Sequence, residues 1–226
     1  MLLNTCVFDA YGTLFDVNAA ARIAANEPNR ETFKEVWPSV SNIWRMKQLQ
    51  YTWLRSITGS YIDFWTVTKN SLDYALEAHG LHENFDLKER LLALYWELQP
   101  YPEVSSMLKK LKTKGVKTAI LSNGSPEMLS SAVKSSNLFE VIDEIISVER
   151  CKVYKPNSEV YKLVTDVFEV KKEEVAFFSS NAWDMHAAAN YGFKTIWVNR
   201  FNGKLERLPG SPSAIVDNLK GITEIV

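Results

Sequence analysis

The 226-residue sequence has little of several features that mark particular classes of protein. Its two cysteines, Cys6 and Cys151, are too few for a disulfide framework, and neither has the clustered Cys or His neighbours of a zinc site. No stretch approaches the roughly 18 apolar residues of a membrane span, and the first residues lack the basic leader of a signal peptide. The net charge of -1 argues against a general binder of nucleic acid. We therefore expect a cytoplasmic protein without nucleic-acid or membrane partners.

What remains is the composition of an ordinary globular protein, with 46% hydrophobic and 23% charged residues. A chain of this length can bury a sizeable core, either as one large domain or as a domain with an insertion. Residues 17–99 favour an insertion, because their apolar side chains recur at helical intervals without the alternation of strands. Pro100 and Pro102 resist helix continuation and close this block. We expect a helical cap domain over 17–99, inserted into a core domain made of 1–16 and 100–226.

Beyond the prolines, helical patterns alternate with short apolar strands. The first strand ends at Phe8, and a last strand and helix are expected over 215–226. The other expected strands cover 117–121, 144–148, 175–178 and 195–198. One helix is expected over 103–114, and three more are expected to begin at Pro126, Pro156 and Ala182. This succession of βα units predicts an α/β fold, a doubly wound, Rossmann-like parallel sheet with helices on both faces.

The stretch around Asp9 carries the strongest sign of chemistry. An apolar strand runs directly into Asp9, and Gly12 and Thr13 follow within one turn, so the strand delivers a carboxylate to a tight loop. An ionised carboxylate at this place loses hydration, which is costly unless charges or donors elsewhere compensate. One aspartate in isolation more often ends a strand or caps a helix. The loops that follow the other strands decide between these interpretations.

Three further polar loops follow strands of the expected sheet. Ser122 and Asn123 open the first, Lys155 lies in the second, and Ser179–Asp184 form the third. In a doubly wound sheet, residues that follow the strands gather at one edge, where ligands bind. Each loop also has a structural explanation, since its polar residues suit helix starts or a solvated charge. Together, however, the loops supply a nucleophile, donors, a cation and a second carboxylate, and we interpret them as one site.

These motifs resemble those of the haloacid dehalogenase superfamily. The segments that carry the likeness are Asp9–Thr13, Ser122–Gly124, Val153–Pro156 and Ser179–Asp184. The segment Trp44–Arg55, which contains Arg45, is similar to the cap helix of one branch, the L-2-haloacid dehalogenases. The resemblance covers nearly the whole chain, and the arginine-bearing helix together with the last loop narrows it to that branch.

The resemblance implies that the protein hydrolyses short-chain L-2-haloalkanoic acids to D-2-hydroxy acids with inversion. Asp9 attacks the carbon that bears the halogen and forms an ester, halide departs beside Arg45 and Asn181, and water activated by Asp184 hydrolyses the ester. The implied catalytic residues are Asp9, Thr13, Arg45, Ser122, Lys155, Ser179, Asn181 and Asp184. The implied substrate-binding residues are Tyr11, Arg45, Leu49, Phe64, Ser122, Asn123, Lys155, Tyr161, Asn181 and Trp183.

No metal ion or cofactor is expected. The phosphatases of the superfamily carry a second aspartate two residues after the nucleophile, and Tyr11 occupies this position. A phenol in place of a carboxylate argues against both a magnesium site and protonation of a leaving alcohol. A halide leaves without a proton and needs donors and positive charge, which Arg45 supplies. A phosphatase of the same superfamily and a catalytically silent binding protein on the same fold stay as alternatives.

Two expectations concern residues away from this centre. The cap carries more apolar aromatic surface than a small lid needs over one cleft, so we expect a homodimer. His186 lies two positions past Asp184, a helical offset that points it elsewhere, so we assign it only a supporting position. Tyr161 and Trp183 are equally well explained as packing aromatics.

Overall fold

The computed structural model describes residues 3–224, and its centre is a six-stranded sheet in the order β3-β2-β1-β4-β5-β6. Every neighbouring pair of strands runs parallel. The strands are β1 (Thr5–Phe8), β2 (Lys117–Ser122), β3 (Glu144–Ser147), β4 (Val175–Ser179), β5 (Lys194–Val198) and β6 (Ala214–Val216). Because β1 lies between β2 and β4 and is covered on both faces, all four of its residues are buried. This position explains the unbroken apolar run before Asp9.

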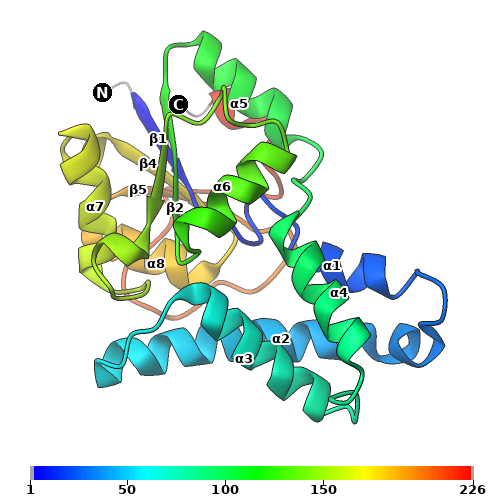
Figure 1. Cartoon of the computed structure of the whole chain (residues 1–226). Helices are drawn as coiled ribbons and strands as arrows, with labels where there is room; N and C mark the ends of the chain where they lie inside the picture. The colour runs from blue at the N-terminus through cyan, green and yellow to red at the C-terminus, as the bar shows by residue number, and fades with distance from the viewer. Residues whose placement is uncertain (1–2, 225–226) are drawn as a thin grey trace.

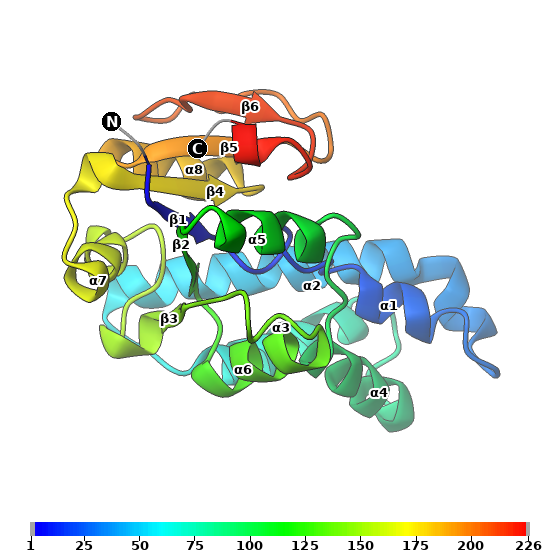
Figure 2. The same ribbon diagram turned by 90° about the horizontal axis from the view of Figure 1, so that it is seen from above.

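Helices cover both faces of the sheet. They are α5 (Val104–Thr113), α6 (Pro126–Ser135), α7 (Ser158–Phe168) and α8 (Ala182–Tyr191). Figure 1 shows α5 and α6 on one side of the strands and α7 and α8 on the other. In the view from above in Figure 2, α5 and α6 are again separate from α7. Right-handed crossovers produce this division, because the chain moves from β1 through β2 to β3 and then returns across the sheet to β4. The predicted doubly wound α/β fold is confirmed.

One helix start and the last element differ from the prediction. The helix expected from Pro156 begins at Ser158, because the side chain of Asn157 caps it by accepting a hydrogen bond from the Glu159 N–H at 3.0 Å. The helix expected near the C-terminus is a single 3₁₀ turn, and residues 225 and 226 of that prediction lie outside the described residues. The 3₁₀ turns are η1 (Val148–Arg150), η2 (Lys172–Glu174) and η3 (Ile222–Glu224).

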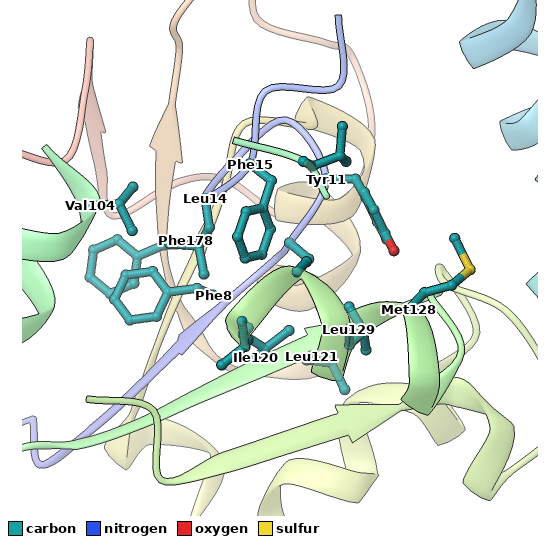
Figure 3. Close-up of a cluster of buried hydrophobic side chains, with 14 of the residues drawn as sticks. Phe8, Tyr11, Leu14, Phe15, Val104, Ile120, Leu121, Met128, Leu129 and Phe178 are labelled. Atoms are coloured by element: carbon teal, nitrogen blue, oxygen red, sulfur yellow. The ribbon is translucent and has the colours of Figure 1, made fainter. Parts of the chain in front are cut away.

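A hydrophobic cluster anchors the strand that precedes Asp9. Phe8 of β1 and Phe178 of β4 stack with ring centroids 4.8 Å apart and planes 16° apart. Figure 3 shows this pair with side chains of β2, α5 and α6 around it. Tightly packed side chains of this kind leave a strand little freedom to shift. The loop after β1 therefore starts from a fixed base.

Four further helices lie beyond the ends of β1 and β2 (Figure 1), and Figure 2 shows the longest of them passing beneath the sheet. They are α1 (Ala19–Ala24), α2 (Glu31–Thr58), α3 (Phe64–Glu77) and α4 (Phe85–Trp96). Gly59, at a positive φ of 65°, ends α2, and Asp63 caps α3 by accepting from the Thr66 N–H at 2.8 Å. Among residues 3–224, no helix combines the length and the apolar character that crossing a bilayer demands.

The two chain segments that lead into and out of these four helices lie side by side. The Asp16 N–H donates to the Gln99 carbonyl and the Tyr101 N–H donates to the Leu14 carbonyl, each at 2.9 Å. Phe15 and Pro100 face each other in an antiparallel bridge between these hydrogen bonds. The return segment therefore contacts the loop that carries Asp9.

Candidate active site

Asp9 is a buried carboxylate with three hydrogen-bond donors. Only 5% of the residue is exposed. Thr13 Oγ1 and Asn181 Nδ2 donate to Asp9 Oδ2 at 3.0 and 2.8 Å, and Lys155 Nζ donates to Oδ1 at 3.1 Å. These donors and the ammonium replace the water contacts that a carboxylate loses on burial.

The turn that follows Asp9 depends on Gly12. Its φ of +91° lies in the region that side chains disfavour, and a Cβ there would lie 3.1 Å from Ser180 Oγ. This close approach lets the Ser180 N–H donate to Thr13 Oγ1 at 2.8 Å, while the same hydroxyl donates to Asp9. The loops after β1 and β4 are thereby joined through Thr13.

Lys155 lies between two carboxylates. Its Nζ is 3.1 Å from Asp9 Oδ1 and 2.8 Å from Asp184 Oδ2, and its side chain is 1% exposed. Burial alone disfavours the ammonium, but the charges of Asp184 and Asp9 outweigh burial and raise the pKa of Lys155 above its ordinary value of 10.5. Lys155 is therefore a fixed cation at neutral pH.

Asp184 is the more deeply buried carboxylate. It receives hydrogen bonds from Lys155, from Ser179 Oγ at 3.0 Å and from the Tyr161 hydroxyl at 2.7 Å. Burial raises the pKa of Asp184, while the ammonium of Lys155 and the hydroxyl of Tyr161 act in the opposite direction. A carboxylate held in this balance is suited to accepting a proton from water.

Arg45 of α2 reaches the same loops from the opposite side. Its Nη2 donates to the Tyr11 carbonyl and to Asn181 Oδ1, both at 3.2 Å. Asn181 is the N-cap residue of α8, yet its side chain makes no capping bond and instead donates to Asp9 and the Tyr11 carbonyl. An N-cap asparagine normally bonds the helix. Because the Asn181 side chain bonds Asp9 in place of its own helix, we assign it to the site.

Tyr11 forms an aromatic wall beside Asp9. Its ring lies 5.6 Å from that of Phe64 and 5.7 Å from that of Tyr95, and burial raises its pKa well above the ordinary value. The ring fits only because residue 124 is glycine, since a Cβ there would lie 2.8 Å from the Tyr11 hydroxyl. Tyr11 is thus a neutral wall at the position where the phosphatases carry an acid.

The loop after β2 serves both the helix and the site. Ser125 caps α6 by accepting a hydrogen bond from the Met128 N–H at 3.3 Å, so part of this loop has the purely structural role of starting a helix. Asn123 Oδ1 accepts from the Lys155 N–H at 3.0 Å and thereby fixes the loop that carries the cation. Ser122 is fully buried, and its Oγ accepts from the Gly124 N–H at 3.1 Å.

Ten of the fourteen residues expected at the site line one small cavity. The ten are Asp9, Tyr11, Arg45, Leu49, Phe64, Ser122, Asn123, Lys155, Asn181 and Trp183. The other four are outside that lining: Thr13 contacts Asp9, Asp184 contacts Lys155, and Ser179 and Tyr161 contact Asp184. Tyr161 was expected to contact substrate, but its hydroxyl donates to Asp184, so we assign it to the support of that carboxylate.

A larger cleft adjoins this cavity through shared walls. Arg45, Leu49 and Asn181 line both spaces, and Trp37 and Phe201 line the outer cleft alone. Trp183, which also lines the inner cavity, packs edge-on against Trp53 of α2, with ring centroids 5.4 Å apart. Side chains of α2 therefore line the inner cavity and also contact Trp183 from outside that lining.

Sequence reasoning missed two residues at this centre. Ser180 lies within the Ser179–Asp184 loop, but the hydrogen bond from its N–H to Thr13 Oγ1 depends on the approach of two loops that are far apart in the sequence. Tyr95, which stacks on Tyr11, lies in α4, where its spacing is that of a packing residue. His186 Nδ1 lies 2.8 Å from the Gly210 carbonyl, which places it against the C-terminal loop.

The residues around Asp9 do not fit a metal ion. In residues 3–224, no group of three or more His, Cys, Asp or Glu side chains is arranged to hold one. The space between Asp9 and Asp184 is taken by the Lys155 ammonium, and the neighbouring phenol of Tyr11 is buried among aromatic rings. A hard cation requires several oxygen ligands, which this set does not supply.

Comparison with known proteins agrees with the site. Residues 3–192 match the family model described as haloacid dehalogenase-like hydrolase. The chain is 46% identical over 200 residues to (S)-2-haloacid dehalogenase 1 of Pseudomonas sp. (strain CBS-3), covering 88% of this chain and 86% of that protein.

Solved structures agree as well. A crystal structure of a dehalogenase matches with a TM-score of 0.94 and 39% identity, covering 99% of this chain and 97% of the other. The L-2-haloacid dehalogenase from Xanthobacter autotrophicus with chloropropionic acid covalently bound matches with a TM-score of 0.85 and 34% identity, covering 100% and 98%. This chain therefore belongs to the haloacid dehalogenase-like hydrolases and, within them, to the L-2-haloacid dehalogenases.

Proposed function

We propose that this protein hydrolyses short-chain L-2-haloalkanoic acids to D-2-hydroxy acids, with Asp9 as the nucleophile. The observation that carries the proposal is the placement of Asp9 at the wall of a small cavity, hydrogen-bonded to the ammonium of Lys155 and with Arg45 of α2 in the same lining. A displacement of halide requires these three elements and no proton donor for the leaving group.

In the first step, an oxygen of Asp9 attacks C2 of the substrate from the side opposite the halogen. Asp9 Oδ2 already accepts two hydrogen bonds, whereas Oδ1 accepts one from Lys155, so we assign the attack to Oδ1. The new C–O bond forms as the C–halogen bond breaks, and the halogen leaves with the electron pair. C2 is inverted once, which gives the D configuration after hydrolysis.

The departing halide needs hydrogen-bond donors in the cavity. Arg45 and Asn181 are the polar groups shared by the inner cavity and the outer cleft, and we assign them to the halide. Ser122 and Lys155, together with main-chain N–H groups, are assigned to the substrate carboxylate or to the balance of charge at Asp9. Leu49, Phe64 and Trp183 supply apolar contacts around C2.

In the second step, water attacks the carbonyl carbon of the Asp9 ester. Asp184 accepts the proton of that water, and Lys155 and Asn181 help to orient the reacting groups. The bond between the Asp9 carbonyl carbon and the ester oxygen on C2 breaks, and the leaving alkoxide takes the proton held by Asp184. The second proton of the water passes to solvent, and one oxygen of the Asp9 carboxylate now comes from water. Tyr161 and Ser179 hold Asp184 during this exchange.

The reaction requires no metal ion, because the Lys155 ammonium supplies the positive charge between the two carboxylates. This feature also distinguishes the proposal from a phosphatase. Such an enzyme needs an acid to protonate its leaving alcohol, and the phenol at position 11 is neutral, buried and held at a raised pKa.

The domain division and the assembly belong to the same proposal. Residues 17–99 form the cap domain over a core of 1–16 and 100–226, and the cap contributes Arg45, Leu49 and Phe64 to the cavity. Met46, Leu54 and Ile57 of α2 are 52%, 50% and 80% exposed on one stripe of the helix, which suits a homodimer face. We place the protein in the cytoplasm, consistent with its two free cysteines.

Halide release from L-2-chloropropionate tests the function. The wild-type protein is expected to release chloride from the L but not the D enantiomer, without added metal. Asp9→Ala should abolish release, whereas Asp16→Ala, a matched change at an acid that pairs with Arg22 outside the cavity, should keep it. Chloride release by the Asp9 variant would remove the assigned nucleophile, and magnesium-dependent release of phosphate would favour the alternative.

A further inference from the structure

Arg200 lies two residues after the end of β5, and its guanidinium contacts three residues of two other segments of the chain. Its Nη2 donates to the Thr13 carbonyl at 2.8 Å, and its Nη1 lies 2.7 Å from Glu103 Oε1. Its Cζ lies 3.7 Å from the centroid of the Tyr101 ring. Only 8% of the side chain is exposed, and it lines neither the inner cavity nor the outer cleft. Arg200 therefore lies outside the lining of the space assigned to the substrate.

Thr13 connects this guanidinium to the reaction centre. Its carbonyl accepts from Arg200, and its hydroxyl donates to Asp9 Oδ2 at 3.0 Å. The same hydroxyl accepts from the Ser180 N–H. Because carbonyl and hydroxyl belong to one residue in a tight turn, a shift of the Thr13 backbone displaces the hydrogen bond that orients Asp9.

Arg200 also stabilises the segment that returns from the cap. Tyr101, on which its guanidinium stacks, donates its N–H to the Leu14 carbonyl, one residue after Thr13. Glu103 is held in turn by the Leu219 N–H at 3.3 Å. The Arg200 clamp, made of Arg200, Glu103 and Tyr101, thus fixes the nucleophile loop against the return segment.

We propose that Arg200 is a positioning residue for Asp9, acting through the backbone carbonyl and the hydroxyl of Thr13. The inference deepens the proposed dehalogenation and rests on it for its kinetic test. A planar guanidinium serves the carbonyl and the carboxylate at once, whereas a lysine ammonium is a single point of charge and cannot span both. Misplacement of a nucleophile by about 1 Å can slow a reaction by about a hundredfold.

The test compares two variants that alter the same buried ion pair. Arg200→Lys keeps the positive charge for Glu103 and loses the Thr13 contact, whereas Glu103→Gln loses the charge and keeps an oxygen that accepts from Arg200. We expect R200K to lower kcat by about tenfold to a hundredfold with KM within about twofold. E103Q is expected to keep kcat within about twofold of wild type, although its melting temperature falls.

A third variant separates positioning from folding. The double change R200M/E103M replaces the ion pair by apolar side chains of similar length, a replacement that often preserves stability. It also removes the Thr13 contact, so its kcat should fall as in R200K. Wild-type kcat in R200K or in the double variant, or a loss in E103Q equal to that in R200K, would overturn the inference.

Hydrogen exchange gives a readout that does not depend on activity. Amide exchange in a peptide covering residues 10–16 should be faster in R200K than in wild type and unchanged in E103Q. If the wild-type protein releases no halide, the proposed function fails, and the exchange measurement still decides whether Arg200 fixes the loop. Equal exchange in wild type and R200K would contradict the positioning assignment.

Discussion

Lys155→Met provides a direct test of the charge arrangement at the site. The change removes the ammonium that lies 3.1 Å from Asp9 and 2.8 Å from Asp184, and it keeps a side chain of similar length. Two carboxylates then face each other without a cation in a region where both residues are at most 5% exposed. Removal of one partner from a buried ion pair costs about 3–5 kcal/mol of unfolding free energy, out of a total of about 5–15 kcal/mol for a typical protein.

The cost should depend on pH in a defined direction. Burial already raises the pKa of Asp184 above its ordinary value of 3.8, and loss of the cation raises it further. The folded variant then binds a proton that the unfolded chain releases, so the variant is less stable at higher pH, by up to about 1.4 kcal/mol per pH unit. In the wild type, the raised pKa of Lys155 keeps its contribution fully present below pH 10.5, the ordinary lysine value.

Urea unfolding followed by circular dichroism at pH 5 and pH 8 measures both effects. Lys162→Met is the matched control, because Lys162 pairs with Asp166 on the exposed face of α7, and it should unfold like the wild type. The destabilisation of K155M should be larger at pH 8 than at pH 5. If K155M is as stable as K162M at pH 8, or if its deficit is the same at both values, the account of Lys155 is wrong.

Three further predictions address other parts of the site. Tyr161→Phe removes a hydrogen bond that lowers the pKa of Asp184, so the acidic limb of the pH–rate profile should move to higher pH. Tyr191→Phe, a matched change on the ring next to Tyr161, should leave the acidic limb unchanged. Dialysis against EDTA should leave chloride release unchanged, and loss of activity restored by magnesium would contradict the assignment of Lys155 as the site's cation. Burial raises the pKa of Glu103, but its hydrogen bonds and the charge of Arg200 outweigh burial and lower the pKa below 4.5, so the ionised form stabilises the fold above pH 4.5. The difference in stability between wild type and E103Q should therefore shrink as the pH falls below 4.5. Thermal melts at several pH values measure this difference.

The position of Asp9 was predictable because it depends on local sequence and on one rule of topology. A buried strand followed by Asp9 and Gly12 predicts a carboxylate at the edge of a parallel sheet, and the helix patterns predict which loops meet it there. The structure has these loops at that edge. Four loops spread over residues 9–184 could therefore be grouped from the sequence alone.

Other residues depend on tertiary contacts that no spacing encodes. Arg45 entered the prediction only through the resemblance of its helix, because the orientation of α2 over the sheet is set by packing. Tyr161 has the spacing of a packing residue in α7, and only the approach of α8 directs its hydroxyl at Asp184. Arg200 reaches Thr13 across 187 positions of the chain, so its contact could not be inferred from either segment. The single 3₁₀ turn near the C-terminus was predicted as a helix, since its short apolar pattern does not specify length.

One turnover in water enriched in heavy oxygen, with the protein in excess over L-2-chloropropionate, tests the central claim that Asp9 forms an ester. The account predicts that the first D-2-hydroxy acid carries unlabelled oxygen and that one heavy oxygen appears in the peptide containing Asp9. Heavy oxygen in the product of that first turnover, with Asp9 unlabelled, would show that water attacks the substrate carbon and would contradict the mechanism.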